Sequence, residues 1–550
     1  MSSTLISSLT WIPRGKAARH PQKYVLDESE LERVGKMGGE GVLEKLRLEM
    51  EAMEMKDANA MATEGGDDDD WEDDSESGAS SSPSDGEAEE GDVDMKPSDP
   101  TDLTAYNLDT YDEEESRGAA MGAFSNIKGL SVYQDNNEDP YITLKDDVDE
   151  EDERANLEVL PTDSIILSAQ TSDDLSSLNY HVYDEENENL FVHHDHLLPA
   201  FPLCVEWLDF PSGGASRSDG KTHGNYIAVG TMDPSIEIFD MDVLEGVYPE
   251  AILGPAAGAE SAVPKAKGTG KKKKRQLQTN PDHHVAAVTS LSWTPHHRNL
   301  LLSSSADMTV KLWDLAQDGQ QKAVRSWDNI HPNEKVLAVV WNKSANGEHS
   351  KVVLSAGERT VKVWDTRAAQ DGLSTGGLGS DVEAICWDPW ASMDFFVSLE
   401  NGLVLCYDAR NLSDAAPRPK YTISAHDGPV SALDVNPHVR GCIATGGMDK
   451  LVKIWNVQEE EDTRREISMV TSQDLGVGKV FTLRWSPDSP LTLAAAGSHA
   501  RLQIWDTGSN AGVRQAFGQR LRQAGKELRE AKKGAGIIGI VDEEEQSDDE

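Results

Sequence analysis

The phrases TSLSWTP (Thr289–Pro295) and TVKLWD (Thr309–Asp314) form a pair that returns four more times before Asp506. The key positions of the first phrase are 48, 46, 48 and 50 residues apart, and those of the second are 51, 43, 48 and 50 apart. A repeat of roughly 40–50 residues that ends in Trp-Asp is typical of propeller blades, each a four-stranded sheet. The first positions are Trp293, Trp341, Trp387, Val435 and Trp485, and the second are Trp313, Trp364, Tyr407, Trp455 and Trp505.

Apolar and polar residues alternate along these phrases, as in TVKLW and LVKIW, so each strand is expected to bury one face. One blade cannot cover its own apolar faces, and neighbouring blades must therefore stack around a common axis. The repeated tryptophans are expected to be structural, because a buried aromatic side chain hides about 150–250 Å² of surface.

The N-terminus is predicted to belong to the first blade. ISSLTWIP (Ile6–Pro13) repeats VTSLSWTP (Val288–Pro295), but strands that could complete its blade appear only from Asp163 to Asp184. Residues 1–15 are therefore assigned to the first strand, and residues 16–162 to an insertion inside the blade. The alternative is that the match is accidental.

A second blade is predicted between Leu203 and Asp240, which brings the total to seven. The predicted fold is an all-β, seven-bladed propeller over residues 163–507, completed by the N-terminal strand. Residues 255–280 form a loop within it, rich in Gly, Ala and Lys. The run Lys271, Lys272, Lys273, Lys274 and Arg275 in this loop is a candidate nuclear-entry signal or phosphate contact, or else a solvated basic linker.

The insertion is predicted to be mostly disordered, with one short helix at Glu40–Lys56. Residues 67–116 contain 21 acidic residues and one basic residue, a composition that cannot bury enough apolar surface to offset the entropy of ordering. Residues 508–550 are predicted to form a basic amphipathic helix (Val513–Lys533), which could lie on the ring or on RNA, and an acidic tail. Ser84 and Ser547 precede acidic residues and are candidate phosphorylation sites.

Composition limits the possible functions. The chain has 550 residues with 51 basic and 98 acidic ones, and its net charge of −47 argues against broad binding to nucleic acid and favours basic partners. Cys204, Cys386, Cys406 and Cys442 lack metal-ligand spacing and are expected to be free thiols in a reducing compartment. No apolar run is long enough to span a membrane, so a soluble intracellular protein is expected.

No catalytic, cofactor-binding or metal-binding motif is found, and we predict that the chain is not an enzyme. The cluster His193–His196 contains ligand types that suit Zn²⁺, but His196 lies 11 residues before Trp207, the first key position of blade two. Comparable histidines, His284, His331 and His426, lie 9, 10 and 9 residues before the first key positions of their blades. A carboxylate recurs six residues before the second aromatic position, as Asp233, Asp307, Glu358 and Asp449. These spacings predict buried polar networks that stabilise the blades. The predicted members are His426, Thr445, Asp449, Trp455, Asp307, Trp313, Trp364 and Trp505.

Several phrases resemble the periodic tryptophan protein 1 family, a group of nuclear and nucleolar WD-repeat proteins. They include SLTWIPRG (Ser8–Gly15), DPYITLKD (Asp139–Asp146), PLCVEWLDF (Pro202–Phe210), NYIAVG (Asn225–Gly230) and QAFG (Gln515–Gly518), together with the acidic insertion and the lysine run. The resemblance implies a WD40-type propeller and a role in ribosome biogenesis, in large-subunit rRNA maturation. It also implies links to histones and to the chromatin of ribosomal RNA genes.

These observations predict a non-enzymatic scaffold in the nucleus and nucleolus, without a cofactor. Its expected partners are pre-ribosomal assembly proteins and a basic client, such as a ribosomal protein or histone, with a local rRNA contact. It is expected to be a monomer within larger assemblies and to have no membrane contact. The alternative is a chromatin-associated histone-binding protein that regulates transcription of ribosomal DNA.

Overall fold

The computed structural model of the chain describes residues 4–26, 30, 33–34, 154, 157–173, 175–212, 222–255, 279–317, 322–344, 346–368, 372–412, 417–459, 465–526 and 536–540. Contacts divide the chain into two units, Met1–Leu46 with Glu151–Glu550, and Arg47–Glu150. All described residues belong to the first unit. The predictions for Glu40–Lys56, residues 67–116, Lys271–Arg275, Ser84 and Ser547 fall outside the described residues.

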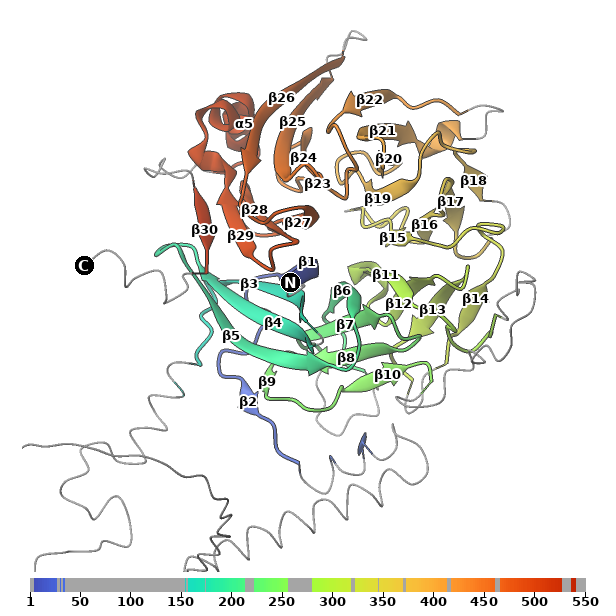
Figure 1. Ribbon diagram of the computed structural model, residues 1–550, viewed down its shortest axis with the longest axis vertical. Helices are drawn as coiled ribbons and strands as arrows, with labels where there is room; N and C mark the ends of the chain where they lie inside the picture. The colour runs from blue at the N-terminus through green and yellow to red at the C-terminus, as the bar shows by residue number, and fades with distance from the viewer. Residues whose placement is uncertain are drawn as a thin grey trace, which may run out of the picture. The chain divides into compact units, whose positions relative to one another are not determined.

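The described residues form seven four-stranded antiparallel sheets around one axis (Figure 1), which confirms the predicted seven-bladed propeller. In each blade the strand nearest the axis contains the first phrase of the repeat, and the third strand contains the second phrase. The strands of blades one to three are β1 (Leu5–Ile12), β3 (Ser164–Ser172), β4 (Leu175–Asp184) and β5 (Asn189–Leu198); β6 (Pro202–Leu208), β7 (Tyr226–Thr231), β8 (Ile236–Asp240) and β10 (Ala251–Leu253); and β11 (Val288–Trp293), β12 (Leu300–Ser305), β13 (Val310–Asp314) and β14 (Arg325–Trp327).

The remaining four blades follow in chain order. Their strands are β15 (Ala338–Trp341), β16 (Val352–Ala356), β17 (Val361–Asp365) and β18 (Leu373–Ser374); β19 (Val382–Trp387), β20 (Asp394–Leu399), β21 (Leu403–Asp408) and β22 (Tyr421–Ser424); β23 (Ala432–Val435), β24 (Cys442–Gly446), β25 (Leu451–Glu459) and β26 (Arg465–Asp474); and β27 (Val480–Trp485), β28 (Thr492–Gly497), β29 (Leu502–Asp506) and β30 (Ile537–Gly539). Because neighbouring strands are antiparallel, the loops after the first and third strands of every blade lie on one face of the ring, here called the lower face.

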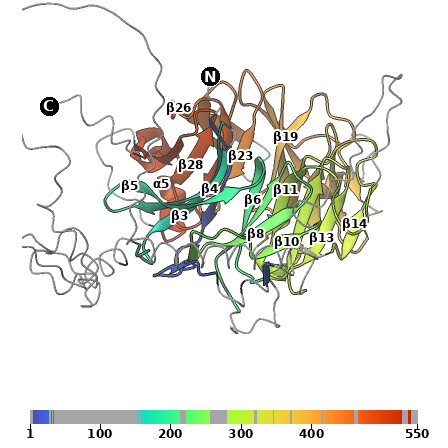
Figure 2. The same ribbon diagram turned by 60° about the horizontal axis from the view of Figure 1, so that its bottom comes forward.

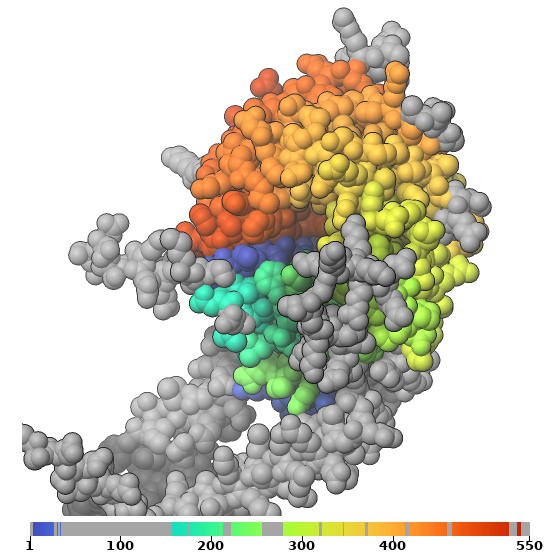
Figure 3. All heavy atoms as spheres, turned by 45° about the vertical axis from the view of Figure 1, so that its right-hand side comes forward, coloured from blue at the N-terminus to red at the C-terminus, as the bar shows by residue number. Residues whose placement is uncertain are grey.

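The first blade combines two distant parts of the chain. β1 pairs antiparallel with β3, and Trp11 lies opposite Ile166. The indole N–H of Trp11 also donates to the carbonyl of Arg484 in blade seven (3.0 Å). In Figure 3 the N-terminal residues (blue) lie between the C-terminal blade (red) and the first blades (teal). The N-terminal strand therefore closes the ring between blades one and seven.

The chain stays in contact with the ring after β1, further than the predicted end of the first strand at residue 15. β2 (Gln22–Lys23) pairs in parallel with β9 (Val243–Leu244) beside blade two. The two ends of the predicted insertion also meet there, because the Val159 N–H donates to the Arg19 carbonyl (2.9 Å). Residues 16–26 and Val159 are thus part of the propeller unit, which repetition of the blade motif alone does not reveal.

Blade seven extends beyond the predicted boundary at residue 507. Its fourth strand, β30, follows the helix α5 (Ala511–Gln523) and pairs with β29. The helix begins at Asn510, whose side chain accepts the N–H groups of Gly512 and Val513, a typical N-cap. Val513, Phe517 and Leu521 lie four residues apart on its buried face, packed on blades six and seven (Figures 1 and 2). Of the apolar stripe predicted for this helix, Leu528 falls outside the described residues.

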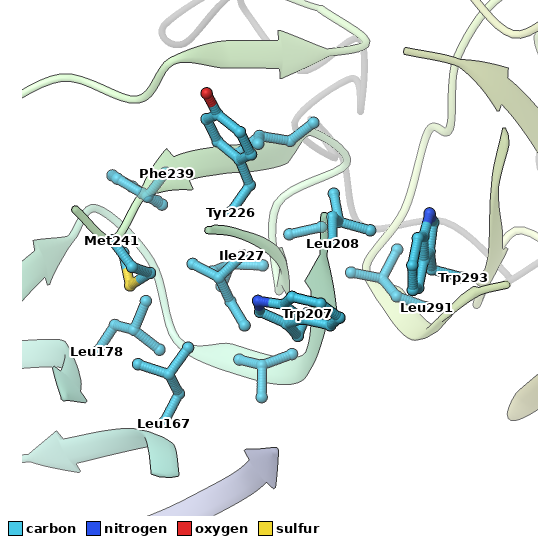
Figure 4. Packing of buried hydrophobic residues seen from close by; sticks show 14 of the residues in the cluster. Leu167, Leu178, Trp207, Leu208, Tyr226, Ile227, Phe239, Met241, Leu291 and Trp293 are labelled. Carbon is cyan, nitrogen blue, oxygen red and sulfur yellow. The ribbon is translucent and has the colours of Figure 1, made fainter. Parts of the chain in front are cut away.

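The core lies between blades as well as within them. Figure 4 shows Trp207 of blade two among Leu208, Ile227 and the blade-three residue Leu291. The rings of Trp207 and Trp293 meet edge to face, with centroids 5.6 Å apart. Such pairs add about 0.5–1.5 kcal/mol to the free energy gained from burial. The first-phrase tryptophans Trp207 and Trp293 therefore help to bind blade two to blade three.

Candidate functional site

Blade three contains the most completely buried polar network of the described residues. The Trp313 indole N–H donates to Ser303 Oγ (2.8 Å), and Ser303 Oγ lies 2.7 Å from His284 Nε2. On the other side of the imidazole, His284 Nδ1 lies 3.0 Å from Asp307 Oδ2. Asp307 also accepts the Thr309 hydroxyl (2.7 Å), and the side chains of His284 and Asp307 are fully buried.

Blade six repeats this arrangement with threonine in place of serine. The Trp455 indole N–H donates to Thr445 Oγ1 (3.0 Å), which lies 2.9 Å from His426 Nε2. His426 Nδ1 lies 3.0 and 2.9 Å from the two oxygens of Asp449. The structure thus brings these four predicted residues together, although the Asp449 side chain is 23% exposed, unlike Asp307.

In blade four a threonine hydroxyl lies between the histidine and the carboxylate. Trp364 donates to Ser355 Oγ (3.0 Å), which lies 2.8 Å from His331 Nε2. His331 Nδ1 faces the Thr360 hydroxyl (2.8 Å), which donates to Glu334 Oε2 (2.8 Å). Glu358, at the predicted position, is exposed. The terminal carboxylate comes from the loop before the blade, so its spacing differs from that of Asp307.

Trp505 is buried in blade seven, but the structure does not place it in such a network. Ala495 pairs with Gln503 where Ser303 pairs with Lys311 in blade three, so the indole meets a methyl group instead of a hydroxyl. The histidine prediction also fails in blade two. His196 Nδ1 faces the Gly246 carbonyl (3.2 Å), and Asp233 is exposed. The repeated network therefore has its histidine–aspartate form only in blades three and six of the described residues.

Sequence spacing identified the joining hydroxyl of blade six, Thr445, but missed those of blades three and four. Ser303 and Ser355 lie on second strands, opposite the lysine of the third strand. Thr309 and Thr360 begin the phrases TVKLWD and TVKVWD and contact the imidazole Nδ1 atoms of His284 and His331. The recurrence of TVK in both blades could have identified these two threonines.

The network histidines are neutral because they are buried. Burial lowers the pKa of His284 and His426 below the usual value and brings that of His331 to about 4. Burial by itself would raise the pKa of Asp307, but hydrogen bonds from His284, Thr309 and the Val285 N–H lower it to about 2. A neutral imidazole donates from Nδ1 to the carboxylate and accepts at Nε2 from the hydroxyl. The histidines of blades three and six then have a partner at both ring nitrogens.

We predict that the ring loses stability between pH 6.5 and pH 4. Burial holds the pKa of His181 and of His331 at about 4, whereas an unfolded histidine titrates near 6.5. The unfolded chain therefore binds more protons in this window, and stability falls as the pH falls. One pKa unit corresponds to about 1.4 kcal/mol, so each histidine is expected to cost about 3 kcal/mol at pH 4.

Urea unfolding followed by tryptophan fluorescence at each pH measures this loss. The matched variant His331→Gln should show a shallower decline over the same window, whatever its stability at pH 7. Identical slopes for the variant and the parent chain would contradict the assignment to His331.

Two kinds of feature are absent from the part of the chain that the structure describes. No group of three or more His, Cys, Asp or Glu side chains in this part of the chain could hold a metal ion, and the His193–His196 cluster is not an exception. Among the helices that the structure describes, none has the length and apolar character needed to cross a membrane.

The four cysteines are free, and burial raises the pKa of each thiol.

Comparison with known proteins gives matches over the repeats and over the whole chain. The family model for the WD domain, G-beta repeat, matches residues 274–314 and 417–456, which contain most of the networks of blades three and six. A WD repeat-containing protein of Schizosaccharomyces pombe is 38% identical over 555 residues, covering 100% of this chain and 97% of the relative.

Two relatives carry a more specific name. Periodic tryptophan protein 1 of Saccharomyces cerevisiae is 32% identical, over 93% of this chain and 90% of its own. The periodic tryptophan protein 1 homologue of Drosophila melanogaster is 26% identical, over 94% and 97%. Identity at this level across nearly the full length extends beyond the repeats to the split first blade and the C-terminal strand. The chain belongs to the periodic tryptophan protein 1 family of WD-repeat proteins.

Proposed function

We propose that the chain is a non-enzymatic scaffold of the nucleus and nucleolus, which acts in large-subunit rRNA processing and pre-ribosome assembly. The observation that carries the proposal is the full-length relationship to periodic tryptophan protein 1 of Saccharomyces cerevisiae, the family whose resemblance implies this role. The geometry is compatible with a scaffold. In blades three, four and six the polar side chains of each network form hydrogen bonds with one another.

The mechanism combines a shaped ring with a diffuse acidic segment. Residues 67–116 have 21 acidic residues and one basic residue, which attracts basic proteins and raises their rate of association. Diffuse charge specifies little geometry, so the ring supplies the specific contacts. In this proposal a basic client, a ribosomal protein or a histone, is held by the ring while the acidic segment shields it from RNA. Phosphate on Ser84 or Ser547 would add to the negative charge.

Affinity purification of the tagged full-length chain from cell extract tests the proposal. We expect large-subunit assembly proteins and precursor rRNA in the eluate, and retention of the proteins after mild RNase treatment. Recovery of nucleosomal histones without precursor rRNA would contradict it and favour the chromatin-associated alternative.

One similarity supports the alternative of a chromatin-associated, histone-binding protein. Histone acetyltransferase type B subunit 2 of Candida glabrata is 23% identical over 242 residues, which cover 42% of this chain and 56% of the relative. The match is shorter and weaker than those to the periodic tryptophan protein 1 relatives, and it covers part of the propeller repeats only. A histone-binding role in transcription of ribosomal DNA is therefore the second candidate.

Replacement of Lys271–Arg275 by alanine is expected to reduce nuclear accumulation of the tagged chain severalfold. The run places five consecutive cations between blades two and three, where an import receptor can recognise them by charge. Fluorescence imaging gives the nuclear-to-cytoplasmic ratio. The charge-preserving control changes Lys271–Lys274 to arginine and should accumulate normally. Equal ratios for the alanine and arginine variants would show that the run is only a linker.

A further inference from the structure

A cavity of about 280 Å³ opens between blades five and six on the lower face. Asp388 and Asp394 line it from the first loop of blade five, and Arg440 from the equivalent loop of blade six. Arg520 reaches it from α5, and apolar side chains of β23, β24 and β25 form the wall between them. Two carboxylates from blade five and two guanidinium groups, from blade six and α5, thus line one cavity.

Arg520 is fixed in place without a carboxylate partner among the described residues. Its guanidinium donates to the Arg440 carbonyl and to the Asn456 amide oxygen, and lies 5.0 Å from the centre of the Phe517 ring. Burial lowers its pKa, but a guanidinium stays charged in a protein. Gly441 (φ +73°) allows this approach, since a Cβ there would lie 2.1 Å from the Val457 carbonyl oxygen and 3.2 Å from Arg520 Nη1. A held positive charge therefore faces the cavity.

The blade-five side of the cavity offers hydrogen-bond acceptors, and the exposed ring of Trp390, which is not among the lining residues, follows Asp388 by two positions. Burial and the nearby Asp394 raise the pKa of Asp388, whose carboxylate accepts the Trp390 N–H (2.9 Å). Asp394 is paired with Lys420 (2.5 Å). Trp390 is 40% exposed, and its indole N–H donates to the Asn436 carbonyl of blade six (2.9 Å). This bond fixes a large exposed ring at the junction of the two blades.

The charges of the lining residues disfavour simple ions as ligands of the cavity. A simple cation would be repelled by Arg440 and Arg520, and a simple anion by Asp388, whereas the charge of Asp394 is offset by Lys420. A group with an anion at one end, neutral N–H donors at the other and a flat ring between them satisfies both sides. Nucleotides of unpaired RNA have these properties, because their bases stack on aromatic side chains, donate from their edges and carry phosphate that arginine binds.

We propose that this cavity binds one unpaired nucleotide of a single-stranded RNA. The phosphate faces Arg440 and Arg520, an amino group on the base edge donates to Asp388, and the base lies beside Trp390. Surrounding cations favour the approach of RNA to this part of an otherwise acidic protein: Arg465 lies 5.7 Å from the Tyr421 ring of the lining, and Lys526 contacts His438 of the blade-six loop. The inference rests on the proposed function, since it names the part of the ring that would contact rRNA.

Fluorescence anisotropy with the full-length chain and labelled oligocytidine or oligouridine of about twelve nucleotides tests the proposal. Cytosine has an amino group where uracil has a carbonyl, and an aspartate accepts from that amino group. We expect tighter binding of oligocytidine, and loss of this preference in Asp388→Asn. Arg440→Gln should weaken binding of both RNAs about tenfold and lower the salt slope by about one. The control Arg359→Gln removes an exposed arginine of blade four, in the turn between β16 and β17 on the other face. It should change neither the affinity for RNA nor the salt slope.

Equal effects of Arg440→Gln and Arg359→Gln, or an unchanged cytidine preference in Asp388→Asn, would overturn the proposal. Displacement of RNA by an oligoglutamate peptide at equal concentration would also overturn it, since the site would then be an acidic-peptide site. Melting curves confirm that each variant is folded. If the chain recovers pre-ribosomal proteins but these variants bind RNA normally, this inference alone fails. If it recovers only histones while the variants behave as expected, the proposed function alone fails.

Discussion

Deletion of residues 1–13 is expected to destabilise the ring by more than about 6 kcal/mol, because full burial of each aliphatic side chain contributes about 1.5–3 kcal/mol. Ile6, Leu9 and Ile12 of β1 are at most 1% exposed, and the deletion also removes Trp11. A loss of this size is comparable with the whole stability of an ordinary domain, about 5–15 kcal/mol. The deleted chain should therefore unfold or aggregate at temperatures where the parent is native.

A synthetic peptide of residues 1–15 provides the control for this deletion. Added to the deleted chain, it should restore a cooperative melting transition, because β1 pairs with β3 and contacts blade seven without a direct covalent link to either strand. The same peptide with Trp11→Ser should restore it poorly. An unchanged melting temperature in the deleted chain would show that β1 does not close the ring.

Asp307→Ala is expected to cost about 3–5 kcal/mol, because it leaves the buried donors of His284, Thr309 and Val285 without their acceptor, and each unsatisfied donor costs about 1–3 kcal/mol. Asp449→Ala should cost less, about 1–3 kcal/mol, since water reaches this partly exposed carboxylate and can replace it. Trp455→Ala should cost about 3–5 kcal/mol as a large-to-small change in the core. Chemical unfolding of each purified variant measures these differences.

Asp233→Ala and Glu358→Ala are the matched controls, because both carboxylates occupy the same repeat position as Asp307 but are exposed. They should leave the unfolding midpoint unchanged. A loss below about 0.5 kcal/mol for Asp449→Ala would place its carboxylate in solvent and contradict the network. Equal losses for Asp307→Ala and Asp449→Ala would contradict the role assigned to burial.

The parts of the fold that were predictable from sequence are those in which local pattern and burial coincide. Trp293 and Trp313 mark strands because a blade must bury one face of each. β30 was missed because Ile537–Gly539 is short and is separated from its blade by a helix. β2 was missed for a related reason: its two residues, Gln22–Lys23, are both exposed, so no apolar alternation marks them.

The polar networks were predictable only where the partners keep a fixed spacing. His426 lies in the loop before β23 and Asp449 in the turn after β24, and their spacing from the key positions of the repeat revealed the pair. Glu334 comes from the loop between blades three and four. It is joined to His331 through hydrogen bonds of the Thr360 hydroxyl. Trp505 occupies the second aromatic position, but the residue six before it is His499 instead of a carboxylate, and the strand register places Ala495 where blade three has Ser303. Register is a property of strand pairing, which spacing along the chain does not specify.

Sedimentation of the tagged full-length chain from nuclear extract tests the central claim most directly. On a sucrose gradient, a scaffold of pre-ribosome assembly should migrate with precursor particles of the large subunit, detected by precursor rRNA in the same fractions. RNase treatment before the gradient should move it to lighter fractions together with assembly proteins. Migration near the position of the free 60.0 kDa chain, or only with nucleosomes, would contradict the claim.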